Sequence, residues 1–378
     1  MTPTRLRPAA AIAAGTLLAL TLSACGSSTD TASSDAAAGA PVDQAVIDAA
    51  TAAVKAAREP ITDFTAPSAP AGPIPTGELV SIVTALNAAP LPYDVGMISK
   101  AAFESLGLKA DVLDGQGSPA GWDKAVRTAL NANAKAIVMS AAEPSLVPEA
   151  AQAAAAQDVP FTTVFGCETP KPDGVSMEVP ETREAEGKLL ADWVMADSPE
   201  GAEVIVQTNA QFFCLAGEVE AFKAELAKGG AAFKVVEETE ATPADQAGTA
   251  AVQKVAGLLR KHPDAHYFFT MQADWAPAFV QGLKSVGRDD VTGLFADSKW
   301  VIDLMRENPN LVAAGPNIEA TAWIGVYATI AAMNGLEVPP MAAPVQLIDS
   351  ENIGTDGDPT EPQYDLAGSW TSFLESGN

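Results

Sequence analysis

Polar and aromatic side chains follow most of the apolar runs that would form the strands of a sheet. Asn87 and Tyr93 come after the first run, and Phe165 comes after the fourth. In the second half of the chain the same position is held by Phe212, Gln272, Asp274, Trp275, Asp297, Asn317 and Glu319. Rings stack on sugar C–H faces or attract cations, and Asp or Asn binds hydroxyl groups. Packing explains any one residue equally well, but the set predicts a site for a polyhydroxylated or cationic small molecule.

Motifs for covalent, metal or nucleotide chemistry are weak. His262 and His266 stand at positions i and i+4, but Pro263 lies between them and a metal would need a third ligand. We interpret both as surface histidines. Gly115-Gln116-Gly117 with Gly121 has the wrong spacing for a dinucleotide fingerprint and indicates a glycine-rich turn. The sequence therefore predicts a protein that is not an enzyme and holds no metal or cofactor.

The composition is strongly acidic. The 378 residues include 22 Lys and Arg against 48 Asp and Glu. Phosphate binding needs clustered basic residues, so nucleic acid is excluded as a partner. An acidic surface keeps an exported protein soluble, and the hydrophobic content of 48% is enough for sizeable cores.

The elements that must position the candidate residues alternate regularly between strand and helix. A buried apolar run at 79–85 is followed by an open loop and a helix at 94–106, the first half of a βαβ unit. Further strands are expected at 108–113, 135–140, 160–165, 174–179, 202–207, 232–237, 266–270, 292–296, 311–314 and 344–348. Further helices are expected at 119–133, 145–157, 181–197, 216–228, 244–261, 275–286, 298–307 and 319–334. This rhythm predicts an α/β fold of two doubly wound, Rossmann-like halves, with ligands met at the carboxyl ends of the strands.

The N-terminus has the features of a secretion signal. Residues 1–24 join a positive start, Arg5 and Arg7, to an apolar core at Ala9–Leu22 that is short for a membrane span. The segment Leu22-Ser23-Ala24-Cys25-Gly26 resembles the lipobox of bacterial lipoproteins, which implies lipidation of Cys25 and an extracytoplasmic, membrane-anchored protein. An ordinary signal peptide with a chance Cys is the alternative. Residues 25–76 are expected to form a tether, a short helix and a Pro-rich linker.

Residues 77–350 resemble the class I periplasmic binding proteins of sugar ABC transporters, the ribose-binding type. The segments that carry the resemblance are Val83-Thr84-Ala85-Leu86-Asn87, Leu108-Lys109-Ala110-Asp111-Val112-Leu113-Asp114, Ala134-Lys135-Ala136-Ile137-Val138-Met139-Ser140, Phe268-Phe269-Thr270-Met271-Gln272-Ala273-Asp274 and Leu294-Phe295-Ala296-Asp297. The resemblance implies that Gln272 and Asp297 contact the ligand, with Glu319 near the last contact before the hinge.

Two loops depart from the family pattern. The family often places Asp-Arg where this chain has Phe165-Gly166-Cys167. It often has an Arg where this chain has Phe212-Phe213-Cys214. Neutral polyols, unusual sugars, and amines or other cations therefore stay open as ligands. Cys167 and Cys214 would either form a disulfide across the cleft mouth or remain free thiols.

The resemblance also implies two lobes, joined by a hinge that the chain crosses three times, near residues 180, 319 and 348. The first lobe is expected to contain residues 77–180 and 319–347, and the second 181–318 and 348–378. The expected protein is a monomer that captures a small ligand by hinge closure and passes it to an ABC permease. A ligand sensor of the same fold is the main alternative. A secreted hydrolase that uses Asp297 or Glu319 is a less favoured alternative, because no nucleophile–base pair in the sequence supports it.

Overall fold

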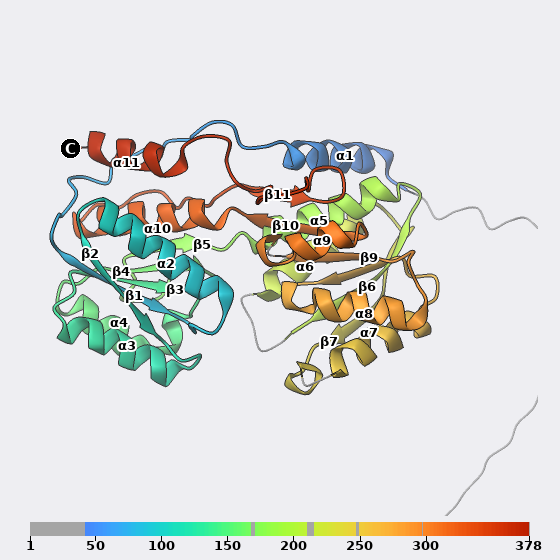
Figure 1. The fold of residues 1–378 in the computed structure, drawn as a ribbon, viewed down its shortest axis with the longest axis horizontal. Coiled ribbons are helices and arrows are strands. Elements are labelled where there is room, and N and C mark those ends of the chain that lie inside the picture. Colours follow the sequence, from blue (N-terminus) through green and yellow to red (C-terminus); the bar gives the residue numbers. More distant parts are fainter. Residues whose placement is uncertain (1–41, 168–170, 210–214, 247–248, 297, 378) are drawn as a thin grey trace, which may run out of the picture. The chain divides into compact units, whose positions relative to one another are not determined.

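The computed structural model describes residues 42–167, 171–209, 215–246, 249–296 and 298–377 (Figure 1). All of them belong to one compact unit, Gly39–Asn378. Within the described ranges, no helix is long and apolar enough to cross a membrane. Cys25, Phe212, Cys214 and Asp297 lie outside the described residues.

The first lobe contains a five-stranded parallel sheet in the order β2-β1-β3-β4-β5. Its strands are β1 (Leu79–Thr84), β2 (Lys109–Asp114), β3 (Ala136–Ser140), β4 (Phe161–Gly166) and β5 (Met177–Pro180). Helices α2 (Pro90–Ser105) and α10 (Ile318–Met333) cover one face, and α3 (Pro119–Asn131) and α4 (Pro148–Ala155) cover the other (Figure 1). The central strands are buried on both faces, as their continuous apolar runs require.

The second lobe contains a six-stranded sheet in the order β11-β10-β9-β8-β6-β7, parallel except for β11. Its strands are β6 (Ala202–Thr208), β7 (Phe233–Glu240), β8 (Tyr267–Thr270), β9 (Thr292–Ala296), β10 (Leu311–Pro316) and β11 (Val345–Ile348). One face packs against α1 (Gln44–Arg58), α5 (Arg183–Asp197) and α6 (Ala216–Lys228). The other packs against α7 (Ala250–Lys261), α8 (Ala276–Val286) and α9 (Ile302–Glu307).

Local sequence signals explain where several elements begin and turn. Ser118 accepts a hydrogen bond from the backbone N–H of Gly121 and caps α3, whose first residue is a proline. A Cβ on Gly121 would lie 2.1 Å from the carbonyl oxygen of Gly115. The glycine-rich stretch is therefore a tight strand-to-helix turn, as expected, because only glycine fits the close backbone approach.

Two parts of the expected lobe division are wrong. Strand β11 pairs antiparallel with β10, so residues 345–348 belong to the second sheet and not to the first lobe. The tail, expected to be irregular and part of the second lobe, ends in helix α11 (Leu366–Ser376), which packs in the first-lobe core through Trp370 and Leu374. Both errors have one cause: a short apolar segment does not encode which lobe it packs on.

Candidate functional site

The carboxyl edge of the first sheet holds Asn87 in a fixed position. The Thr84 hydroxyl donates a hydrogen bond of 2.6 Å to Asn87 Oδ1, and the Asn87 backbone N–H donates one of 3.0 Å to Asp114 Oδ1. Asn87 is half-buried, so its amide remains accessible from the edge. Tyr93, in the first turn of α2, is 41% exposed. The structure thus places both residues after the end of β1, as predicted.

The neighbouring strands β3 and β4 end in strained backbone. Ala141 and Phe165 have φ values of 52° and 59°, a region that a bulky side chain such as Phe rarely adopts. The Ala141 N–H donates to the carbonyl oxygen of Val164 at 2.9 Å, and the register between β4 and β5 shifts at Val164/Gly166. Strain of this kind persists only where surrounding packing imposes it, and it is common at ligand sites.

Phe165 itself is 4% exposed and belongs to the first-lobe core. Cys167, two positions later, is disulfide-bonded, and the other two cysteines of the chain lie outside the described residues. The alternative of a free thiol at Cys167 is therefore wrong, while its partner stays a prediction.

The carboxyl edge of the second sheet joins two amide side chains. Asn209, which follows β6, is 3% exposed, and its Nδ2 donates a hydrogen bond of 2.8 Å to Gln272 Oε1. Gln272 follows β8, and its backbone N–H donates to the Thr270 hydroxyl at 3.3 Å. Strands β6 and β8 are neighbours, so the sheet brings these residues together. We named Gln272 from the sequence, but not Asn209 as its partner.

Asp274 and Trp275 are adjacent in sequence, but their side chains lie in different surroundings. Asp274 is exposed, whereas Trp275 is 3% exposed and packs with aromatic residues such as Phe268 and Phe279 in the second-lobe core. The expectation that Trp275 offers an open ring face is not met, because a large apolar ring gains most free energy by burial. Its position at a strand end does not fix the direction of its side chain.

Asn317 and Glu319 lie where the chain returns to the first lobe. Asn317 is 6% exposed, and its Oδ1 accepts a hydrogen bond of 2.8 Å from the backbone N–H of Ala320. It is therefore the N-cap of α10. Glu319 is half-buried in the first turn of this helix, where its negative charge is stabilised by the helix dipole.

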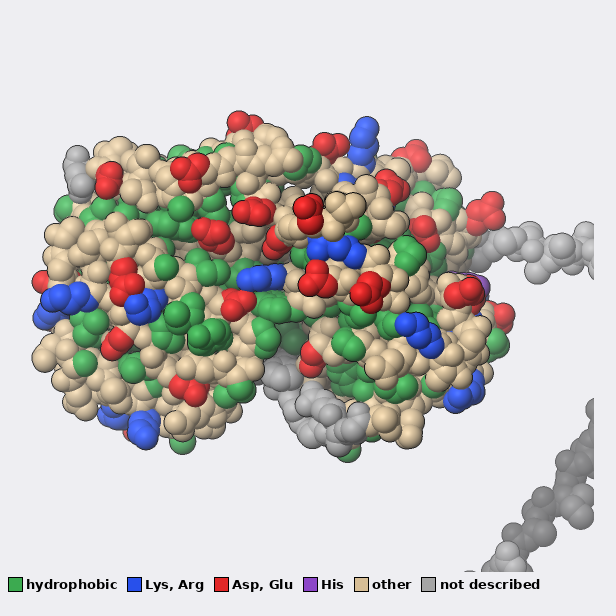
Figure 2. Space-filling model, viewed as in Figure 1, with side chains coloured by type: hydrophobic (Ala, Val, Ile, Leu, Met, Phe, Trp, Pro, Cys, Tyr) green, Lys and Arg blue, Asp and Glu red, His purple; other side chains and the backbone are tan. Residues whose placement is uncertain are grey.

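The two lobes touch through residues that we did not include in the candidate site. Lys299, in the short 3₁₀ helix η5 (Ser298–Trp300), lies 2.9 Å from the carboxylate of Asp94 in α2. The next residue, Trp300, packs against the first-lobe core although it belongs to the second lobe. Figure 2 shows the surface hollowed where the two lobes meet. The sequence predicts one helix from Ser298 onward, whereas the structure has a separate 3₁₀ helix at Ser298–Trp300 before α9.

The two histidines do not form a pair. His262 Nε2 lies 2.8 Å from Glu237 Oε2, and His266 Nδ1 lies 3.0 Å from Asp290 Oδ2. His266 stands just before β8, at the amino edge of the sheet, away from Gln272. In the part of the chain that the structure describes, no group of three or more His, Cys, Asp or Glu side chains could hold a metal ion.

Residues 96–337 match the family model of the periplasmic binding protein domain. The structure resembles an ABC sugar transporter subunit from Rhodobacter sphaeroides 2.4.1, with a TM-score of 0.63, 19% identity, and coverage of 73% of this chain and 99% of that chain. It also resembles the Caulobacter myo-inositol binding protein bound to myo-inositol, with a TM-score of 0.62, 20% identity, and coverage of 74% and 96%. A solute binding protein from Burkholderia graminis C4D1M in complex with D-arabinose gives a TM-score of 0.64 at 20% identity, with coverage of 74% and 98%. No curated protein is similar enough in sequence to count as a relative. At these identities, the solved structures establish the fold.

Proposed function

The chain belongs to the periplasmic binding protein family, and from this premise we propose that it captures a neutral sugar or polyol between its two lobes. The captured ligand would pass to an ABC permease. This family consists of substrate-binding proteins, so we assign no catalytic step to the site.

The observation that carries the proposal is the pair of amide-bearing sheet edges. The first lobe presents Asn87, and the second presents Asn209 bonded to Gln272. An amide both donates and accepts hydrogen bonds, as a hydroxyl group does, so these side chains suit a neutral polyhydroxylated ligand. The myo-inositol and D-arabinose bound by the two similar solute-binding proteins support this ligand class.

The mechanism that fits this arrangement is closure of the lobes on the ligand. A ligand that touches both sheet edges binds the closed conformation better than the open one, and it shifts the equilibrium by that difference in affinity. Within this proposal, Tyr93, Phe165, Phe212, Asp274, Asp297, Asn317 and Glu319 remain predicted ligand neighbours. Glu319 and Asp274 would favour an amine, which keeps a cationic ligand, or a sensor for one, as the alternative.

Replacing Gln272 tests the proposed site. Gln272→Leu keeps the approximate size of the side chain and removes its hydrogen bonds. We expect the dissociation constant of the ligand to rise about tenfold or more. The reason is that a polar group of the ligand loses its hydrogen bond to the Gln272 amide and faces an apolar side chain instead. Gln253→Leu on the exposed face of α7 is the matched control. Equal affinities in the parent and both variants, measured by calorimetry, would place the ligand elsewhere.

We propose also that the protein is exported and anchored to the membrane through Cys25. The support is the sequence alone, the charged and apolar leader followed by the Leu22–Cys25 segment. Cell fractionation of Cys25→Ala tests it. The variant should be released from membranes or remain unprocessed, whereas processing and membrane association like the parent would exclude the anchor.

A further inference from the structure

A segment for which the sequence predicts a short helix and an extended, Pro-rich linker is packed against both lobes in the structure. Residues 42–77, here called the N-terminal arm, lie outside the region 96–337 that matches the family. The arm begins on the second lobe, where Ile47, Ala50 and Val54 of α1 are buried in the core beside α5. Val42 also forms an isolated bridge with Gly230. The first part of the arm, helix α1, is therefore docked on the second lobe, although the chain after the arm enters the first lobe at β1.

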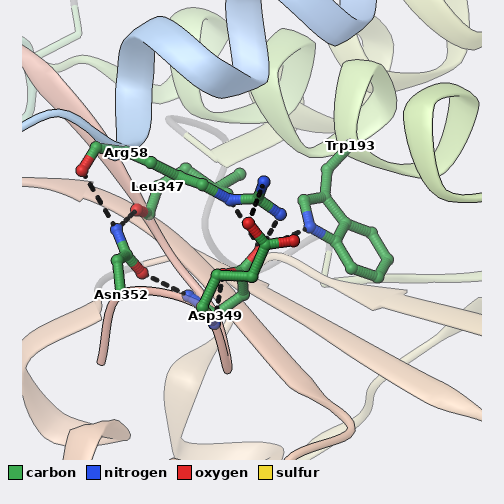
Figure 3. Close-up of polar contacts among 6 residues, drawn as sticks. Arg58, Trp193, Leu347, Asp349 and Asn352 are labelled. Carbon is green, nitrogen blue, oxygen red and sulfur yellow. Dashed lines mark hydrogen bonds and ion pairs between the residues drawn. The ribbon is translucent and has the colours of Figure 1, made fainter. Parts of the chain in front are cut away.

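An ion pair fastens the end of α1 to the second lobe (Figure 3). Arg58 Nε donates a hydrogen bond of 3.0 Å to Asp349 Oδ2, and Nη2 contacts the same oxygen. Trp193 Nε1 of α5 donates to this oxygen at 2.8 Å, and the Asp349 side chain is 3% exposed. Asn352 Nδ2 reaches the carbonyl oxygens of Arg58 at 3.4 Å and Leu347 at 2.7 Å. Asp349 directly follows β11, so the arm is tied to the point where the chain leaves the second sheet.

The other end of the arm is fastened to the first lobe. The Phe64 ring lies 5.1 Å from the Trp370 ring of α11 in an edge-to-face arrangement. The Tyr327 hydroxyl of α10 donates a hydrogen bond of 2.9 Å to the carbonyl oxygen of Ala69. Asn334 Nδ2, just after α10, donates to the carbonyl oxygen of Ala71 at 3.0 Å. Aromatic packing and hydrogen bonds from side chains to backbone carbonyl groups thus fix residues 64–71 to the first-lobe core.

The residues after β11 follow the same route. Residues 349–377, here called the C-terminal tail, start at Asp349 on the second lobe and end in α11 on the first. Between the two lobes, the Gln363 backbone N–H donates a hydrogen bond of 2.8 Å to the carbonyl oxygen of Ile61. In Figure 1 the arm and the tail run along the same side of the molecule, between α1 and α11. The two segments are therefore bonded to each other where both pass from lobe to lobe.

We propose that the arm and the tail form a strap that limits how far the two lobes can separate. Hinge motion is absorbed by a few residues at the crossings, and each added crossing with fixed ends restricts it. Here residues 59–63 join an anchor on one lobe to an anchor on the other. A larger separation on this side would have to break the Arg58–Asp349 pair, the Phe64 packing or both. This inference rests on the proposed hinge-closing function. In that function, the strap would limit how far apart the lobes lie in the open conformation.

Single-molecule energy transfer between the lobes, measured without ligand, tests the strap. Dyes are attached through an azide-bearing amino acid that replaces Lys124 on α3 and Lys284 on α8, both exposed. The first variant is Arg58→Met with Asp349→Asn, which removes both charges together and leaves no buried ion unpaired. The second is Phe64→Ala, which releases the other end. The control is Arg127→Met, which removes an ion pair with Asp123 inside α3.

We expect both strap variants to show a broader distribution of lobe distances than the parent, with the control unchanged. Amide exchange in α1 should accelerate by about tenfold in the Arg58→Met/Asp349→Asn variant, which reports that the anchor has been released. A distance distribution equal to that of the parent in both variants, with faster exchange in α1, would overturn the strap. If one variant does not fold, the other still decides. Because no ligand is present, this result is independent of which ligand binds, or whether any does.

Discussion

Lys299 of the second lobe and Asp94 of the first lobe form an ion pair, with Nζ 2.9 Å from Oδ2. Asp94 directly follows Tyr93 near the start of α2, and Lys299 stands two positions after Asp297. The pair thus joins the two loops from which we expected ligand contacts, and it does so between lobes that must move relative to each other in the proposed mechanism.

Replacing Lys299 should weaken ligand binding modestly. The side chains are 38% and 32% exposed, so solvent screens the pair, and such pairs contribute about 0.2–1 kcal/mol. We expect Lys299→Met to raise the dissociation constant by up to about fivefold at low salt, with the difference shrinking at high salt. Calorimetry at two salt concentrations measures it, with Arg127→Met as control. An effect that does not depend on salt would assign Lys299 a different role.

The two tryptophans near the site should respond differently to substitution. Trp275 is 3% exposed in the second-lobe core, so Trp275→Ala should cost about 3–5 kcal/mol of unfolding free energy. Trp300 is half-buried against the opposite lobe, so Trp300→Ala should lower ligand affinity more than stability. Denaturant unfolding and calorimetry on both variants test this. A large loss of affinity in a stable Trp275→Ala protein would restore our original expectation for that ring.

The carboxyl group of Asp192 makes the unfolding free energy depend on pH, and the sign of this dependence can be predicted. Burial, and next the repulsion from Glu225, raise the pKa of Asp192 to about 6 from its ordinary 3.8. The folded state therefore binds this proton more tightly than the unfolded state does, and the associated stability is present below about pH 3.8 and lost as the pH rises through about 6. Asp192→Asn should stabilise the protein above about pH 6, with the gain disappearing toward pH 4.

Denaturant midpoints across this pH range measure the effect on Asp192→Asn. Asp173→Asn, at an exposed aspartate, is the control. A stabilisation that is the same at every pH would show that the amide acts through packing and not through the charge of the carboxyl group.

The disulfide of Cys167 should have Cys214 as its partner. The chain has three cysteines, and we expect Cys25 to be lipidated and so unable to pair. Peptide mapping of the non-reduced protein should give one linked peptide pair containing positions 167 and 214. A link to Cys25 would contradict both this pairing and the proposed anchor.

The alternation of elements could be predicted because its signals are local. Apolar runs such as Ile137–Met139 mark strands buried on both faces, and Ser118 marks the start of a helix. Most strands and helices accordingly lie within a few residues of their expected positions. Helix α11 was missed because only Leu366, Trp370 and Leu374 are buried, a pattern too short to stand out.

The arrangement of the site was less predictable because it depends on partners distant in sequence. The direction of the Trp275 ring is set by Phe268, Phe279 and the rest of the core, and the amide pair Asn209–Gln272 exists only because β6 and β8 are neighbours. Similarly, no residue near Arg58 in the sequence indicates that Arg58 forms an ion pair with Asp349. Strand ends could be named in advance, but not the contacts between them.

A thermal-shift screen of the purified protein with neutral sugars and polyols, amines and amino acids tests the central claim most directly. At a concentration of 100 times its dissociation constant, a ligand adds about 2.7 kcal/mol to the unfolding free energy, which raises the melting temperature measurably. We predict that at least one neutral sugar or polyol gives this shift and is recovered unchanged from the protein. A shift given by amines alone, or conversion of the bound compound into a product, would contradict the account.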